Sequence, residues 1–215
     1  MEHITLPNLF FERSLEMDKK PFLWKKQNGQ WLSLSWKETE EKVKQVAAGL
    51  KSYGIGPGDK VVIVSENRPE WVISNIAIIT LGAITVPAFI TNTEEDHRYI
   101  IEHSEAKAVI VSNNVLANRI ALAINKNEIC KLLIIIDEYQ GFTPEHLKIT
   151  SFEELLDIGK NDVKSSLYNL NTIERDDVSC IIYTSGTGGR PKGVMLTHKS
   201  IYSNLIGSEE LVRQV

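Results

Sequence analysis

The sequence has few cysteines and lacks a long run of basic residues. Cys130 and Cys180 are the only two cysteines in 215 residues, and neither belongs to a CxxC pair. This spacing indicates neither a disulfide framework nor a zinc site, and it favours a reducing, cytoplasmic setting. The 24 basic and 28 acidic residues give a net charge of −4. The basic surface that nucleic-acid binders need is missing, so we expect no nucleic acid among the partners.

One uncharged stretch, residues 71–93, is long enough to raise the question of a membrane-spanning helix. Gly82 interrupts it near the middle, and Pro87 lies in its second half. The helical piece before Gly82 would be about 21 Å long, which is too short for a hydrocarbon core of about 30 Å. The sequence therefore predicts a buried helix followed by a buried strand, with at most peripheral contact to the inner face of a membrane.

Helical and strand-like segments alternate along most of the chain. Aromatic-rich segments 21–25 and 30–34 flank Asn28-Gly29, the favoured two-residue turn, and predict an edge hairpin. Ser35 and Glu38 then form a capping box that opens a helix. The helix is predicted to end at residue 54, and the β-branched run 60–65 is typical of a strand covered on both faces. Three further pairs are predicted: a helix at 69–81 with a strand at 84–89, a helix at 93–105 with a strand at 107–112, and a helix at 115–126 with a strand at 131–137. Strands that alternate with helices of this length predict an α/β fold with a mostly parallel, doubly wound sheet and flanking helices.

The last third of the chain is less regular. The predicted elements are an irregular stretch at 138–150, a short helix opened by Ser151 and Glu154, an exposed connection at 160–177, strands at 178–184 and 193–197, and a helix from Lys199. No cap, glycine or proline closes that helix before Val215, so we expect the chain to be the opening part of a longer protein. The expected organisation is an edge hairpin region at 1–34, an α/β subdomain at 35–177, and a phosphate-loop segment at 178–215 that starts a second, truncated subdomain.

Residues 183–193, YTSGTGGRPKG, directly follow a predicted strand and carry the strongest chemical signal in the sequence. Glycines let backbone N–H groups converge on an anion, because no Cβ blocks the approach. Thr184, Ser185 and Thr187 add hydroxyl donors, and Lys192 adds a positive charge. Such a segment has what a polyphosphate site requires.

Two better-known phosphate loops do not match this segment. The Walker pattern GxxxxGK[ST] needs a glycine before the lysine and a hydroxyl after it, where this chain has Pro191 and Gly193. The dinucleotide pattern GxGxxG has Pro191 at its third glycine, and the segment leads into a strand instead of a helix. A plain surface turn is the remaining alternative, but it needs neither three hydroxyls nor the Pro-Lys-Gly ending.

The segment 183–198, YTSGTGGRPKGVMLTH, resembles the signature of the adenylate-forming (AMP-binding) superfamily, which includes acyl-CoA synthetases, luciferases and nonribosomal peptide adenylation domains. The resemblance covers roughly the whole chain after Gln30. The upstream segments that carry it are LSWKET at 34–39, GDKVV at 58–62 and LGAITVP at 81–87. The segments most similar to bacterial long-chain fatty acid–CoA ligases are ENRPEW at 66–71, NTEEDH at 92–97 and the double glycine at 188–189.

The resemblance implies the N-terminal part of the large domain of a cytoplasmic ligase. In such an enzyme a carboxylate, here a long-chain fatty acid, attacks the α-phosphate of ATP in the presence of Mg²⁺, and the acyl group then passes to the thiol of coenzyme A. Pyrophosphate leaves with concentrated negative charge, which preorganised donors stabilise. The implied phosphate-binding residues are Thr184, Ser185, Gly186, Thr187, Gly188, Gly189 and Gly193, with Lys192 as the catalytic electrostatic partner. No metal ligand is implied in this chain.

Three histidines and Tyr183 are further candidates for a functional role. His97 and His103 are six positions apart, a spacing that does not stack them on one helix face, so a metal pair is not expected. His198 either lines an acyl or nucleotide pocket or is a structural histidine at a strand end. Tyr183 is expected to pack beneath the glycine-rich segment.

The family's adenine, ribose and magnesium residues, its hinge and its C-terminal catalytic lysine lie downstream of this signature and are absent here. We therefore expect the 215-residue chain alone to be inactive, with an exposed apolar surface where further chain would pack. Three alternatives stay open: a fatty acid–CoA ligase, an enzyme of the same chemistry with another carboxylate or acceptor, and a non-catalytic truncated paralogue that binds nucleotide or a partner protein. Acyl chain length and oligomeric state do not follow from the sequence.

Overall fold

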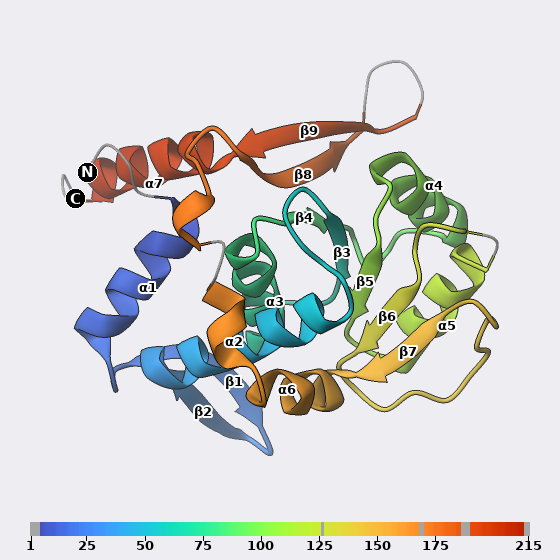
Figure 1. The fold of residues 1–215 in the computed structure, drawn as a ribbon, viewed down its shortest axis with the longest axis horizontal. Coiled ribbons are helices and arrows are strands. Elements are labelled where there is room, and N and C mark those ends of the chain that lie inside the picture. The colour runs from blue at the N-terminus through green and yellow to red at the C-terminus, as the bar shows by residue number, and fades with distance from the viewer. Residues whose placement is uncertain (1–4, 126, 168–169, 186–189, 213–215) are drawn as a thin grey trace.

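A seven-stranded sheet forms the centre of the computed structural model, which describes residues 5–125, 127–167, 170–185 and 190–212 (Figure 1). The strand order is β7-β6-β5-β3-β4-β8-β9, and neighbouring strands are parallel except for the last pair, β8 and β9. The strands are β3 (Lys60–Val64), β4 (Ile84–Pro87), β5 (Ala108–Val111), β6 (Leu132–Ile135), β7 (Lys148–Ser151), β8 (Val178–Thr184) and β9 (Lys192–Thr197). The predicted doubly wound α/β fold with a mostly parallel sheet is confirmed.

Helices cover both faces of the sheet, which explains why its central strands are continuous apolar runs. Alternate residues of β3 face opposite ways, so Val61 and Ile63 join one buried cluster, while Val62 and Val64 join the other. The first cluster is closed by α2 (Trp36–Ser52), α3 (Pro69–Thr80) and α6 (Phe152–Lys160). The second is closed by α4 (Glu94–Ser104) and α5 (Asn114–Ala123).

The predicted hairpin and its following helix are present. Strands β1 (Pro21–Gln27) and β2 (Gln30–Ser35) form a separate two-stranded antiparallel sheet. Asn28 and Gly29 have φ values of 50° and 80°, as a primed two-residue turn requires. The Ser35 hydroxyl accepts from the backbone N–H of Glu38, whose carboxylate accepts from the backbone of Ser35, so the predicted capping box is confirmed.

Two elements were not predicted from the sequence. Helix α1 (Leu6–Met17) lies within the region expected to be only an edge hairpin, and its buried side is narrow, with Pro7, Phe10 and Ser14. Pro7 near the helix start was an available signal. Strand β7 lies where 138–150 was expected to be irregular. It has four residues and pairs only with β6, so little local pattern marks it. The connection after α6 contains two short 3₁₀ helices, η1 (Val163–Leu167) and η2 (Leu170–Thr172).

Within the uncharged stretch 71–93, the predicted buried helix is present as most of α3, and the predicted strand as β4. The strand is shorter than predicted, because β4 ends at Pro87 and Phe89 is exposed. Within the ranges that the structure covers, no helix combines the length and apolarity needed to cross a bilayer. Cys130 and Cys180 are both free thiols.

Helices α2 and α6 cross at a distance that only glycine permits. A Cβ built on Gly159 would lie 1.8 Å from the carbonyl oxygen of Gln45, and one on Gly49 would lie 2.5 Å from that of Leu155. Both obstacles are backbone atoms, which cannot rotate away as a side chain can. The two glycines therefore set how closely α6 packs on α2.

We expect Gly159→Ala to lower the free energy of unfolding by about 2–3 kcal/mol, because the helices must separate to admit the methyl group. The matched control is Gly207→Ala in the exposed helix α7 (His198–Val212), where a Cβ meets nothing within 4 Å. That change is expected to stabilise by about 0.5–1 kcal/mol through helix propensity. Urea unfolding of the two variants checks this. Equal midpoint urea concentrations for Gly159→Ala and Gly207→Ala would contradict the close packing of α6 on α2.

Candidate functional site

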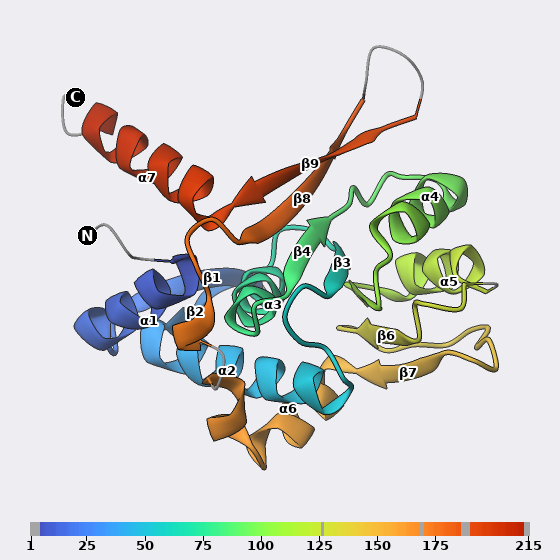
Figure 2. The same cartoon turned by 45° about the horizontal axis from the view of Figure 1, so that its top comes forward.

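Strands β8 and β9 flank the glycine-rich segment and extend away from the rest of the sheet (Figure 2). In the antiparallel register of the two strands, Thr184 is paired with Lys192. Ser185 directly follows β8, so the hydroxyl-bearing start and the lysine end of the segment lie together. The register between β8 and β4 contains one residue pair, Thr85 with Cys180.

Four of the eight predicted site residues lie within the described part of the chain. Thr184, Ser185 and Lys192 are exposed, and Gly193 is half-buried. Within the described ranges, no hydrogen bond or ion pair engages the side chains of the three exposed residues, so a ligand would displace no internal partner. Gly186, Thr187, Gly188 and Gly189 lie outside the described residues, and their part in phosphate binding stays a prediction.

Gly193 is a site of close approach between the two strands. A Cβ there would lie 2.9 Å from Cγ2 of Ile181 and 3.3 Å from Cζ of Tyr183. The Tyr183 side chain therefore lies across Gly193, and only 9% of Tyr183 is exposed. Burial, and next the neighbouring Tyr99, raise the pKa of Tyr183 to about 12, so its phenol stays protonated at neutral pH. Tyr183 packs against Gly193 at the lysine end of the segment.

The three histidines have separate surroundings. Nδ1 of His103 lies 2.7 Å from the hydroxyl of Tyr183. His97 is fully buried, and neither of its ring nitrogens has a hydrogen-bond partner among the residues that the structure describes. Burial, with Arg119 as a second cause, lowers the pKa of His97 to about 4, which keeps the ring neutral. His198 is also buried, and burial lowers its pKa to about 4 although Asp177 opposes the shift. Its burial favours the structural role, one of the two alternatives for His198.

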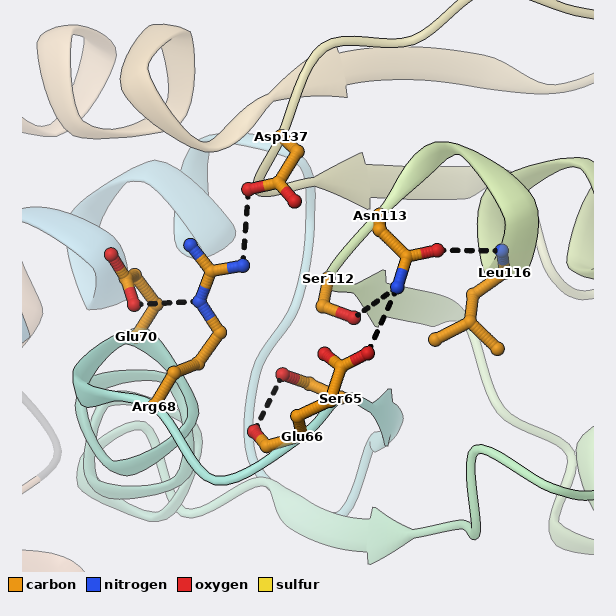
Figure 3. A network of polar contacts seen from close by, with 8 residues as sticks. All are labelled: Ser65, Glu66, Arg68, Glu70, Ser112, Asn113, Leu116 and Asp137. Carbon is orange, nitrogen blue, oxygen red and sulfur yellow. Dashed lines mark hydrogen bonds and ion pairs between the residues drawn. The ribbon is translucent and has the colours of Figure 1, made fainter. Parts of the chain in front are cut away.

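A second polar cluster, at the carboxyl ends of β3, β5 and β6, was missed from the sequence (Figure 3). Asn113 donates to the Glu66 carboxylate at 2.9 Å, which joins the segments after β5 and β3. Arg68 donates to Glu70 at 2.8 Å and to Asp137 at 3.0 Å, which adds the segment after β6. A signal was available, because polar residues that directly follow buried parallel strands gather at one sheet edge.

This carboxyl-edge cluster bridges the point where the winding of the sheet reverses. The chain leaves β3 toward β4 on one side and leaves β5 toward β6 on the other, so a crevice is expected between β3 and β5. The Asn113–Glu66 hydrogen bond spans that position. Burial raises the pKa of Glu66, but hydrogen bonds from Ser112 and Asn113 and the charge of Arg68 outweigh it and hold the pKa below its usual value. The carboxylate is thus held charged by the protein's own groups.

A mostly apolar pocket lies between this cluster and β8. Its apolar lining includes Trp71, Phe89, Ile90, Ile182 and Tyr183, and Ser65, Glu66 and Asn67 of the segment after β3 line its polar side. Of the Phe89 side chain, 72% is exposed. Ile182 also pairs across the hairpin with exposed Val194, so apolar surface extends from the pocket along β8 and β9. An exposed apolar surface was expected from the sequence.

Comparison with known proteins agrees with this geometry. The family model described as AMP-binding enzyme matches residues 11–214. A long-chain-fatty-acid–[acyl-carrier-protein] ligase of Arabidopsis thaliana, AEE15, is 31% identical and is aligned over 79% of this chain and 25% of its own length. The long-chain-fatty-acid–CoA ligase FadD15 of Mycobacterium tuberculosis is 29% identical over 96% of this chain and 33% of its own length.

The fold is also shared with solved structures. A luciferase-like enzyme from the mealworm Zophobas morio superimposes with a TM-score of 0.80 at 20% identity, over 95% of this chain and 45% of that one. At this identity the likeness concerns the fold alone. The chain spans about a quarter to a third of the length of the two curated relatives.

We expect the stability of the chain to fall between pH 6.5 and pH 4, in part because of His97. In the unfolded state the imidazole of His97 takes up a proton near pH 6.5, whereas in the folded state the buried ring stays neutral until about pH 4. The stabilisation is therefore complete above pH 6.5 and is lost on acidification. Urea unfolding at pH 7.5 and pH 5 should show a smaller decrease for His97→Gln than for the wild type. The control is His146→Gln at an exposed histidine, and equal decreases in all three proteins would contradict this account.

Proposed function

Because the chain belongs to the AMP-binding enzyme family, we propose that it supplies the phosphate-binding part of an enzyme that uses ATP to activate a carboxylic acid. One observation carries the proposal: Thr184 and Lys192 face each other in the register at the two ends of the glycine-rich segment. Hydroxyls and an ammonium group, all without internal partners in the described structure, are the donors that a polyphosphate needs.

These residues have a defined task in the proposed reaction. When a carboxylate attacks the α-phosphate of ATP, negative charge accumulates on the departing pyrophosphate. Thr184 and Ser185 would donate hydrogen bonds to it, and the ammonium group of Lys192 would offset its charge. Donors fixed before the reaction lower the barrier, because they do not need to reorganise as the charge forms.

The other expected ligands have weaker support in this chain. The donor set described above fits ATP as the polyphosphate substrate. For Mg²⁺, no group of three or more His, Cys, Asp or Glu side chains suited to a metal ion occurs among the described residues. Mg²⁺ and coenzyme A therefore rest on the family alone, and we derive no step from them.

For the substrate, we propose a long-chain fatty acid. Both curated relatives described above are named as long-chain fatty acid ligases. The apolar pocket beside β8, lined by Phe89, Ile90 and Ile182, supports an aliphatic substrate, because it lies next to Tyr183 at the start of the glycine-rich segment. Aliphatic chains gain free energy when they leave water for such a surface.

For the acceptor, we propose coenzyme A, with a carrier protein as the second candidate. The name of FadD15 favours coenzyme A, and that of AEE15 favours a carrier protein.

A cytoplasmic location is part of the proposal, since the free thiols of Cys130 and Cys180 suit a reducing compartment. The division into subdomains at residues 34 and 177 also stays a proposal.

The proposed activity is tested by ATP–pyrophosphate exchange with carboxylates from acetate to palmitate. The assay is run on the 215-residue chain and on the full reading frame that contains it. Exchange that depends on long-chain acids in the full reading frame, and not in the 215-residue chain, is expected. Exchange in neither would contradict the proposal and favour a non-catalytic protein. Adding coenzyme A or an acyl carrier protein then identifies the acceptor.

We expect Lys192→Ala to reduce the exchange rate of the full reading frame by about 10²-fold, the cost of removing one preorganised donor. The matched control is Lys199→Ala, which removes another exposed lysine seven positions later. Lys199 pairs with Asp176 at 3.4 Å on the surface, and such pairs contribute little. An unchanged rate in Lys192→Ala would show that this lysine has no part in the reaction.

A further inference from the structure

Three rings from α4 and β8 pack together next to the glycine-rich segment. Tyr99 and His103 are four positions apart on α4 and so share one face of the helix. Their ring centroids are 5.2 Å apart, and Tyr183 meets both edge-on, at 6.2 Å from Tyr99 and 5.7 Å from His103. We call Tyr99, His103 and Tyr183 the ring cluster. Edge-to-face contacts of this kind add to the stability from burial.

The ring cluster holds both ends of the glycine-rich segment. At its start, the hydroxyl of Tyr183 lies 2.7 Å from Nδ1 of His103. Near its end, the hydroxyl of Tyr99 donates to the carbonyl oxygen of Pro191 at 2.9 Å. The guanidinium group of Arg190 lies 5.4 Å from the centroid of the Tyr99 ring, within cation–π range. Residues 92 positions apart in the sequence are thus joined directly.

The attachment matters because the register between β8 and β4 ends before the glycine-rich segment begins. It contains the pair Thr85 and Cys180, and the two-stranded ribbon beyond that pair would be marginally stable alone. Helix α4, in contrast, is well anchored. Thr93 and Asp96 form a capping box at its start, and Arg98 donates from Nε to the carbonyl oxygen of Ala123.

We propose that Tyr99 is a positioning residue for Lys192, a role that rests on the function proposed above. The carbonyl of Pro191 and the nitrogen of Lys192 belong to one planar peptide group. The ring of Pro191 already restricts the backbone before this group, and the hydrogen bond from Tyr99 fixes the orientation of its plane. Lys192 therefore starts from a defined backbone position, which is the preorganisation that charge stabilisation requires.

The first test does not depend on activity. Tyr99→Phe removes the hydroxyl and keeps the ring, so the fold should persist. In the 215-residue chain we expect the backbone amides of residues 192–194 to exchange hydrogen about fivefold faster, which corresponds to the loss of one ordinary hydrogen bond. The control is Tyr139→Phe, which removes a hydroxyl that donates to the carbonyl oxygen of Phe142. Equal exchange at residues 192–194 in wild type and Tyr99→Phe would overturn the proposal.

The second test asks whether Tyr99 acts through Lys192. In the full reading frame, Tyr99→Phe is expected to lower kcat/KM for ATP about 5- to 10-fold, with the KM for the carboxylate unchanged. In a Lys192→Ala background, the same change should cost nothing further, because the group that Tyr99 positions is gone. Equal losses in both backgrounds would indicate a general structural effect and overturn the positioning role.

The two tests separate this inference from the proposed function. A wild-type protein that catalyses no exchange with any carboxylate contradicts the proposed function, and with it the role of Tyr99. An active wild type whose kcat/KM for ATP is unchanged by Tyr99→Phe contradicts the role of Tyr99 alone.

Discussion

Burial of the parallel sheet on both faces is the constraint on which the rest of this structure depends. Val61, Val62, Ile63 and Val64 are completely buried, alternately under two different layers of helices. Neighbouring parallel strands need crossover connections, most of which are helical here, so the carboxyl ends of the strands meet at one edge of the sheet. The polar groups that follow the parallel strands are thereby brought to that edge. The carboxyl-edge cluster and the start of the glycine-rich segment are both consequences of this arrangement.

The same edge is used in two different ways. Between β3 and β5, where ligands bind in many open α/β sheets, Glu66 and Asn113 hydrogen bond to each other. At β8, Thr184 and Ser185 have no such partners in the described structure. The two places differ because an antiparallel strand follows β8. This strand, β9, places Lys192 opposite Thr184 and so brings hydroxyl donors and a cation together. The candidate phosphate site therefore lies at the margin of the sheet and depends on α4 for its support.

The sequence was most informative where local chemistry decides the structure. The capping box at Ser35, the Asn28-Gly29 turn and the apolar strand runs all predicted elements that are present. The sequence was less informative where contacts between distant residues decide the structure. Strand β7 exists through its pairing with β6, and α1 buries too few apolar residues to show a clear period. The link of Tyr99 to Pro191 joins residues that no local pattern relates. For the site, Thr184 and Lys192 follow from composition and family resemblance, and the structure adds that they are paired in the register. Phosphate binding by these residues and by Gly186–Gly189 stays a prediction.

The central claim is that the segment between β8 and β9 binds the phosphates of ATP. The most direct measurement is an NMR titration of the full reading frame with ATP, with backbone amides assigned for residues 184–193 and for the carboxyl-edge cluster. The account predicts the largest saturable shifts at Thr184, Ser185, Lys192 and Gly193, and their loss in Lys192→Ala. Saturable shifts centred on Glu66 and Asn113 instead, or none at all, would contradict it.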